Sequence, residues 1–520
     1  MKSFRPFFYV AVLLAAVVAP ACSPGSRSAG YIVYRLNADP TTLDPAYIVD
    51  VTGGSIAAKL FNGLVRLDKE LHVIPDIAGS WEIRDGGRTY VFHLKKHISF
   101  SNGRAVTAAD FRYSFERVLS PEGRCPNTWV LDKIAGSDEF RQGSAGHVDG
   151  IGVTDPQTLV LRLKEPFAPF LQLLTMTAAY VVPEEEVKRR GPDFSSSPVG
   201  TGPFTLQEWR HNTEVVLKRN TAYFGDKAHV KGIRYRIIPE DLTAVTEFEL
   251  GNIDVISVPA YEYSRYRMSG AWKNLMASLH GLNTYYLGFN CSRPPFDDPE
   301  VRRAVARAID REKILRTFYE GRGRLASGPV PDLLRSWAAP VASPYDPAGA
   351  RRTIEKKGLS GRVVHFYVNA DPEVVDIAEI IQSYLKAAGL RVKIRQLEWS
   401  AYKMAVNSGE ADIFWLSWWA DYPDPENFLF PLFHSSNHGA SGNRSRYTNP
   451  EVDRLIVEGQ KTVDVRERNS LYREAEYRIV NDMPWVFFWH KTDFTVRQPT
   501  LKHYLIYPIY SIDKGTEVSF

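Results

Sequence analysis

The stretch Phe414–Leu429 reads FWLSWWADYPDPENFL and joins a run of aromatic side chains to a carboxylate. Trp418 and Trp419 come just before Asp421, and a backbone interrupted by prolines follows. Aromatic faces bind apolar groups and cations with little directional demand, although aromatic side chains serve more often as core. The Asp421 carboxylate could form an ion pair with a cationic ligand, or it could hydrogen-bond its own backbone in the turn. The stretch therefore indicates either a ligand site or an ordinary turn.

Asp424 and Glu426 lie close to Asp421 in sequence, and glycoside hydrolysis requires two carboxylates. The prolines between them make the spatial separation unpredictable, and acids in a turn are usually solvated. We expect no catalytic residue here. His434 and His438 are four residues apart, but their setting HSSNHGASG indicates a surface loop. We expect no metal site there.

The length, the net charge and the absence of common motifs exclude several classes of function. The chain has 520 residues, a formal net charge of only +4 and 11 Trp. This length predicts two or three domains, and the small net charge argues against a nucleic-acid partner. No GxxxxGK[ST], GxGxxG, HExxH, CxxC or GxSxG motif occurs in the sequence. We expect neither a cofactor nor enzymatic activity.

The first residues are typical of an export signal. Lys2 and Arg5 precede an apolar run over residues 7–19, too short to span a bilayer. Small residues lead to Cys22, as in a bacterial lipobox, although Ala19 stands where Leu is usual. We predict lipidation of Cys22, which would anchor the protein to a membrane through the tether 23–30. The alternative is ordinary cleavage after Ala21.

Two further cysteines, Cys125 and Cys291, could form a disulfide in an exported protein or stay as buried thiols. The sequence leaves both possibilities open.

The predicted elements change in character along the chain. Strands and a hairpin around Asp-Gly-Gly at residues 81–94 dominate the first half, with a capping box at Thr107 opening a helix. Later, Asp-Pro pairs at 298, 346 and 371 predict helix starts. Strands at 390–397 and 411–418 alternate with these helices and predict a partly parallel sheet. Residues 486–510 are expected to form strands that return to the first lobe.

Six blocks of sequence, in order, resemble the peptide-binding proteins of ABC transporters, the family 5 extracytoplasmic solute-binding proteins. They are DPTTLDPA (39–46), KLFNGLVRLDKELHVIPDIAGSWEI (59–83), TYVFHLKKHISFSNGRAVTAADFRYSFERVLSP (89–121), GTGPFTLQEW with LKRNTAYFG (200–209 and 217–225), YYLGFNCSRPPFDDPEVRRAVARAIDREKI (285–314) and WADYPDPENFL (419–429).

The resemblance implies an α/β, periplasmic-binding-protein-like fold of the cluster C type, with two main lobes, a hinge and an extra β-rich domain. A discontinuous lobe I would comprise residues 30–60, 185–272 and 490–520. The β-rich domain would span 61–184, and lobe III would span 273–489. Ligand would be held between lobes that close about the hinge.

The resemblance also implies a site. In the family, the acid of the motif W-x-[AG]-D binds the peptide's amine, and here that acid is Asp421, after Trp418 and Trp419. A Glu-Trp pair on a neighbouring strand would place Trp399 as a second aromatic wall. One of Tyr285 and Tyr286 would face the cleft, because neighbouring strand residues point to opposite faces.

Two finer points follow from the resemblance. Thr128 or Trp129 of the second domain is a weaker candidate for ligand contact. Some relatives hold the peptide carboxylate with an Arg before the motif, but this chain has Trp415 there, with Lys403 nearby. This difference puts peptide length in doubt.

The expected function is peptide capture outside the cytoplasm and delivery to an ABC permease, by a monomer without enzymatic activity. The alternatives are a non-peptide solute (a nickel chelate, haem, an opine or an oligosaccharide) and a secreted carbohydrate hydrolase.

Overall fold

The computed structural model describes residues 30–341 and 343–520. The predicted signal segment, Cys22 and almost the whole tether lie outside this range. Among the described residues, no helix combines the length and apolarity that crossing a membrane requires.

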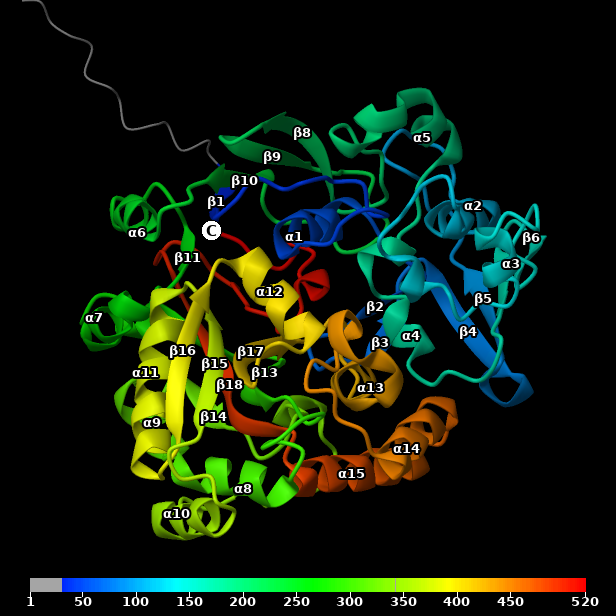
Figure 1. Ribbon diagram of the computed structural model, residues 1–520. Helices are drawn as coiled ribbons and strands as arrows, with labels where there is room; N and C mark the ends of the chain where they lie inside the picture. Colours follow the sequence, from blue (N-terminus) through cyan, green and yellow to red (C-terminus); the bar gives the residue numbers. More distant parts are fainter. Residues whose placement is uncertain (1–29, 342) are drawn as a thin grey trace, which may run out of the picture.

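One sheet runs through both halves of the molecule (Figure 1) and, within the described residues, contains twelve strands. Its order is β16-β15-β17-β13-β18-β11-β1-β10-β9-β8, and β12 and β14 also pair with β18. The strands are β1 (Tyr31–Leu36), β8 (Phe204–Arg210), β9 (Glu214–Arg219), β10 (Gly232–Ile237), β11 (Val255–Ser257), β12 (Met276–His280), β13 (Asn283–Phe289), β14 (Gly323–Leu325), β15 (Val363–Asn369), β16 (Arg391–Leu397), β17 (Ile413–Trp419) and β18 (Trp485–Arg497).

Strand β18 joins the two halves of this sheet. Its first part pairs with β13 and β14, and its last part, from Thr492, pairs with β12 and β11. Beside it, the chain passes from β12 to β13 through Gly281 and Leu282. At this crossing, the Asn283 side chain accepts from the Lys491 backbone N at 2.7 Å and donates to its carbonyl at 3.3 Å. Two neighbouring strands thus carry the connection between the halves.

Two smaller sheets lie on the other side of the first half (Figure 1). One has the order β4-β5-β7-β6 and the other pairs β2 with β3. The predicted hairpin is confirmed, with Gly86 of its turn at a φ of 62° that favours glycine. The bounds are β2 (Val65–Leu67), β3 (Val73–Pro75), β4 (Ala78–Arg84), β5 (Thr89–Leu94), β6 (Ile151–Asp155) and β7 (Thr158–Arg162).

Helices cover the sheets. Their bounds are α1 (Val51–Leu60), α2 (Ala108–Leu119), α3 (Ser137–Arg141), α4 (Phe170–Leu173), α5 (Glu184–Arg190), α6 (Asp241–Glu249), α7 (Tyr263–Met268), α8 (Pro299–Ala308), α9 (Arg311–Thr317), α10 (Pro347–Lys356), α11 (Pro372–Ala387), α12 (Trp399–Ser408), α13 (Glu426–Phe433), α14 (Pro450–Lys461) and α15 (Val465–Asp482). The capping box at Thr107 and the three predicted Asp-Pro starts are confirmed.

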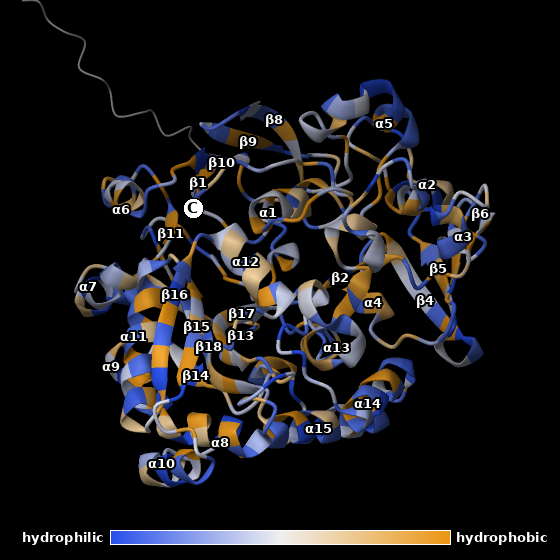
Figure 2. Cartoon of the chain, viewed as in Figure 1, coloured by the Kyte–Doolittle hydropathy of each residue, from blue (hydrophilic) through white to orange (hydrophobic). Residues whose placement is uncertain are grey.

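Two large hydrophobic clusters form the core. The first joins residues of β1, α1, the β4–β7 sheet, β9 and β10, so the predicted lobe I and β-rich domain share buried contacts. The second lies between β13, β15, β17, β18 and the helices around them. At the sheet edge, β16 alternates hydrophobic and hydrophilic residues (Figure 2), in keeping with one buried face. The domain borders expected from the resemblance stay predictions.

Two sequence expectations were wrong. Residues 486–510 do not form several strands: β18 ends at Arg497, and a 3₁₀ turn at Tyr510–Ile512 follows irregular chain. Trp399 is not on a strand beside β17, because it begins helix α12 and β15 separates β16 from β17. Glu398 instead caps that helix by accepting from Ser400 N at 2.8 Å.

Candidate functional site

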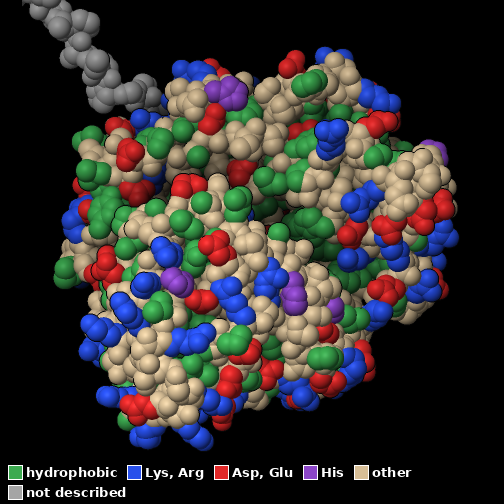
Figure 3. Space-filling model, viewed as in Figure 1, with side chains coloured by type: hydrophobic (Ala, Val, Ile, Leu, Met, Phe, Trp, Pro, Cys, Tyr) green, Lys and Arg blue, Asp and Glu red, His purple; other side chains and the backbone are tan. Residues whose placement is uncertain are grey.

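A cavity of about 920 Å³ lies between the two halves. Its walls come from the start of α1, the 3₁₀ turn Thr128–Val130, α4, the end of β17, α13 and residues 507–510. The surface is hollowed between α1 and α13, and hydrophobic side chains gather around the hollow (Figure 3). This volume lies in the range of small-molecule binding sites.

Asp421 lines this cavity just beyond the end of β17. Asn427, near the start of α13, holds it from two sides. The Asn427 Oδ1 accepts from the Asp421 backbone N at 3.0 Å, and the Asn427 Nδ2 donates to the carboxylate at 3.4 Å. Ala420 N donates to Leu282 O at 2.8 Å, which ties the loop to the crossing segment. The sequence reasoning missed Asn427, since nothing in PDPENF distinguishes it from a turn residue.

Asp421 is exposed to solvent at the cavity wall, although much of the surrounding space is filled by protein. Burial raises its pKa, and the hydrogen bond from Asn427 only partly offsets this. Across the described residues, no Lys, Arg or His side chain forms an ion pair with it. Tyr510, which also lines the cavity, has its pKa raised by burial and further by the nearby charges of Asp421 and Asp50. The cavity therefore contains a solvent-accessible carboxylate that has no cationic partner among the described residues.

Aromatic side chains stand beside this acid. Trp418 and Trp419 both line the cavity, and the Trp418 Nε1 lies 3.4 Å from the Asn427 Oδ1 to which it donates. Trp129 lines the opposite wall, with its ring centroid 6.2 Å from that of Tyr422. Thr128, the other candidate of the second domain, is not among the lining residues. The aromatic faces thus come from both sides of the cavity.

Three other predicted residues lie elsewhere in this structure. Tyr286 is 1% exposed and its ring stacks on Trp485 within the core. Tyr285 lies on the other face of β13, against Trp419 at a centroid distance of 6.5 Å, but outside the cavity lining. Trp399 is 50% exposed, with the Lys403 ammonium 5.7 Å from its ring centroid, and it also does not line the cavity.

The other acids of the opening stretch are buried and hydrogen-bonded, so the expectation of solvated turn acids was wrong for them. Asp424 forms an ion pair with Arg468 at 3.2 Å. Glu426 accepts from Gln460 at 2.7 Å and from the Tyr422 hydroxyl, and burial raises its pKa to about 7. These contacts hold the loop that contains Asp421 in its conformation.

The remaining sequence candidates are placed as follows. Trp415 is buried against Phe488, with ring centroids 4.7 Å apart, and does not face the cavity. The His438 Nε2 donates to the Tyr447 carbonyl oxygen at 3.1 Å. Among the described residues, no group of three His, Cys, Asp or Glu side chains is arranged to hold a metal ion. Cys125 and Cys291 are both free thiols, which resolves that alternative.

Two halves joined by crossing strands around a cavity define the periplasmic-binding-protein-like class, and comparison with known proteins confirms that class. The sequence matches the family "Bacterial extracellular solute-binding proteins, family 5 Middle" over residues 72–440. The chain belongs to this family, and it is an extracellular solute-binding protein.

Individual relatives cover nearly the whole chain. Haem-binding protein A of Haemophilus influenzae is 28% identical, over 93% of this chain and 91% of its own length. The probable D,D-dipeptide-binding periplasmic protein DdpA of Escherichia coli is 27% identical, over 98% and 97%. The solved structure of the Escherichia coli murein tripeptide-binding protein MppA superposes with a TM-score of 0.76 at 26% identity, over 94% and 99%.

Proposed function

We propose that this protein captures peptides with a free amino terminus and delivers them to an ABC permease. The observation that carries the proposal is Asp421, a carboxylate that lines the interlobe cavity and has no cationic partner among the described residues. A free peptide always presents an ammonium group, whereas its side chains vary. An ammonium bound there would supply the missing charge, in a pair worth roughly 4 kcal/mol at an effective dielectric of 20 before desolvation costs.

The charge of the cavity wall supports a ligand with positive charge. The described side chains that line it include one amine and five carboxylates: Lys133, Asp50, Asp132, Asp421, Glu426 and Asp493. The single amine is already paired, because Lys133 lies 3.2 Å from Asp132. Like charges placed opposite each other cost several kcal/mol. The wall therefore disfavours haem, which carries two carboxylates, although haem appears in a relative's name.

The apolar part of the wall supports tolerance of varied side chains. Trp129, Trp418 and Trp419 offer flat faces that bind apolar groups and cations without strict geometry. Described residues supply no arginine to the cavity wall, and we infer that the peptide carboxylate is not gripped by a fixed ion pair. Tyr285 and Trp399 would join the site when the halves close.

Closure would occur where β18 and the β12–β13 connection cross between the halves. Backbone pairing, the Asn283–Lys491 bonds and side-chain bonds from His280 and His490 span this point on those strands. Because the connection is confined to two neighbouring strands, modest changes in φ and ψ would rotate one half against the other. We further propose that lipid on Cys22 anchors a monomer at the membrane beside the permease. Useful affinity would be about −8 kcal/mol, near micromolar, because transfer requires release.

Isothermal titration calorimetry with matched peptides tests the proposal. A tripeptide such as Ala-Leu-Ala should bind, and its N-acetylated form should bind at least 30-fold more weakly. The variant Asp421→Asn should lose the distinction between the two, while Asp376→Asn, an exposed acid on α11, should keep it. Equal binding of both peptides to the unmodified protein, or tight binding of haem alone, would overturn the proposal.

A further inference from the structure

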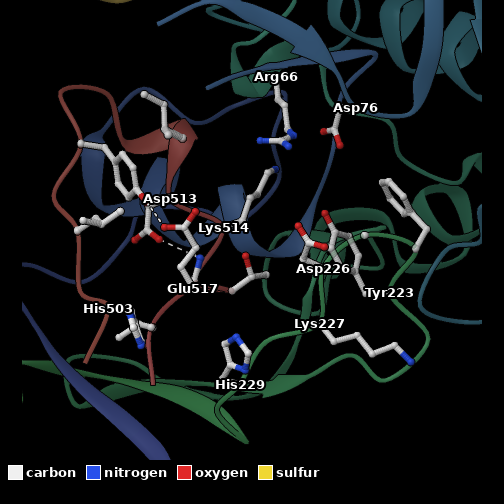
Figure 4. Close-up of a pocket in the computed structure, with 18 of the residues that line it drawn as sticks. Arg66, Asp76, Tyr223, Asp226, Lys227, His229, His503, Asp513, Lys514 and Glu517 are labelled. Atoms are coloured by element: carbon white, nitrogen blue, oxygen red, sulfur yellow. Dashed lines mark hydrogen bonds between the residues drawn. The ribbon is translucent and has the colours of Figure 1, made fainter. Parts of the chain in front are cut away.

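A second cavity of about 470 Å³ lies at the junction of the β2–β3 hairpin with the C-terminal segment. Figure 4 shows its walls, which come from β2 and β3, from the loop 223–229 and from residues 503–518. Tyr507 lines both this cavity and the interlobe cavity, so the C-terminal segment forms the wall between them. Nothing in the proposed capture of peptides uses this space.

Lys514 is a deeply buried cation of this cavity. It is 8% exposed, and burial lowers its pKa to about 8. Its ammonium donates to the Phe61 carbonyl at 2.9 Å and lies 5.3 Å from the Tyr180 ring centroid. It forms no ion pair with a carboxylate of the described residues. An ammonium has three donors and this one forms a single hydrogen bond to the described residues, so two donors remain for a ligand.

Arg66 supplies a second cation without a counterion. It lies on β2 between Val65 and Leu67, which are both buried, so strand alternation directs it to the opposite side. Figure 4 shows its side chain extending from β2 into the cavity. Among the described residues, its guanidinium has neither an ion pair nor a hydrogen bond. An arginine fork of this kind matches carboxylate and phosphate oxygens.

The acids of the same wall already have donors of their own. Asp76 accepts two contacts from the Asn62 amide, at 2.9 and 2.8 Å. Asp513 is paired with Lys59 at 3.0 Å, and Glu517 accepts from the Tyr507 hydroxyl at 3.0 Å. Asp226 is exposed at the rim, as are Lys95, Lys227, His229 and His503. The lining carries as many acids as Lys and Arg side chains, but among the described residues none of these acids forms an ion pair with Arg66 or Lys514.

We propose that this cavity is a binding site for a small anion that bears a carboxylate or phosphate group, held between Arg66 and Lys514. The bound anion would link the β2–β3 hairpin to the C-terminal segment and stabilise their junction. This site is separate from the peptide cavity, and the proposal does not depend on peptide binding.

Thermal unfolding and calorimetry with inorganic phosphate, citrate and acetate, each at fixed ionic strength against sodium chloride, test the proposal. Phosphate or citrate should raise the midpoint of thermal unfolding by several degrees. This increase should become smaller above pH 8, because Lys514 then loses its proton. Phosphate acting alone would assign a phosphate site, and citrate or acetate acting alone would assign a carboxylate site. An equal increase of the unfolding midpoint when sodium chloride replaces these anions would overturn both assignments.

Arg66→Met is the decisive variant, because Arg66 is only half-buried and forms no contact that folding requires. It should remove the anion-dependent gain while the midpoint in chloride stays within about a degree. Lys514→Met should act likewise, but its burial makes misfolding a risk, and Arg66→Met alone is sufficient. Lys313→Met, on α9 of the other half, should keep the full gain. An undiminished gain in Arg66→Met would contradict the assignment.

Discussion

The Asn427 side chain forms two hydrogen bonds with Asp421. Its amide oxygen accepts from the Asp421 backbone N at 3.0 Å, and its amide nitrogen donates to the Asp421 carboxylate at 3.4 Å. Asn427 is itself 3% exposed and lies within the first turn of α13. The acid that we propose as the ligand anchor is therefore positioned by a buried amide, and the helix that carries this amide fixes its direction.

Replacing Asn427 tests this positioning. Asn427→Ala should weaken peptide binding by about three- to tenfold, because neutral hydrogen bonds contribute roughly 1 kcal/mol each. Asn427→Asp keeps the acceptor for the backbone N but places a second negative charge beside Asp421, so it should raise the pKa of Asp421 further and move binding to higher pH. Calorimetry over a pH series distinguishes the two variants. Identical pH profiles for both would contradict the positioning role.

Peptide affinity should fall in acid because burial raises the pKa of Asp421 in the empty cavity. The ammonium binds the ionised acid, so binding must displace a proton wherever Asp421 is protonated. Affinity should drop by up to tenfold per pH unit below that raised pKa and be constant above it, up to about pH 7, where the peptide amine begins to lose its proton. Asp421→Asn should show a flat profile. An acid-insensitive affinity in the unmodified protein would argue against the anchor.

Glu426 should make the fold less stable as pH rises. Its pKa is raised from 4.5 to about 7 by burial, so the native state binds more protons than the unfolded state between these values. The unfolding free energy should therefore decrease between about pH 4.5 and 7, by about 3 kcal/mol at most, and then level off from this source. Glu426→Gln should flatten this slope in urea unfolding series. A slope that persists unchanged in the variant would show that other groups cause it.

Both thiols should be unreactive and unpaired. Burial raises the pKa of Cys125 and raises that of Cys291 to about 12, so little thiolate exists near neutral pH. Intact-mass measurement after iodoacetamide should give no labelling of the folded protein and labelling of both residues in urea. A reducing agent should leave the melting temperature unchanged. A mass two units lower, with labelling that requires reduction, would indicate a disulfide instead.

Local signals in the sequence predicted the secondary structure well. Asp298, Asp346 and Asp371 cap helices because each precedes a proline at the first helical position. Thr107 and Asp110 form the predicted capping box, with Thr107 N donating to the Asp110 carboxylate at 2.8 Å. These features depend on neighbours within four residues, which the sequence displays directly.

Features that depend on contacts between residues far apart in the sequence were harder to predict. The hydrophobic spacing of β13 does not tell which of Tyr285 and Tyr286 meets the core, and only the register with β18 places Tyr286 against Trp485. The resemblance predicted Trp399 as a cavity wall, but Trp399 begins helix α12 after β16, and β15 lies between β16 and β17. Asp493 enters the cavity wall from a strand far along the chain. No local sequence pattern predicts that such a residue lines the cavity.

The most direct test is a crystal structure of the protein with a bound tripeptide. The peptide ammonium should lie within about 3 Å of the Asp421 carboxylate, with Trp129, Trp418 and Trp419 against its side chains and the two halves closer together. If the ammonium were bound elsewhere, with residue 421 directed at bulk water, the proposed anchor would be wrong.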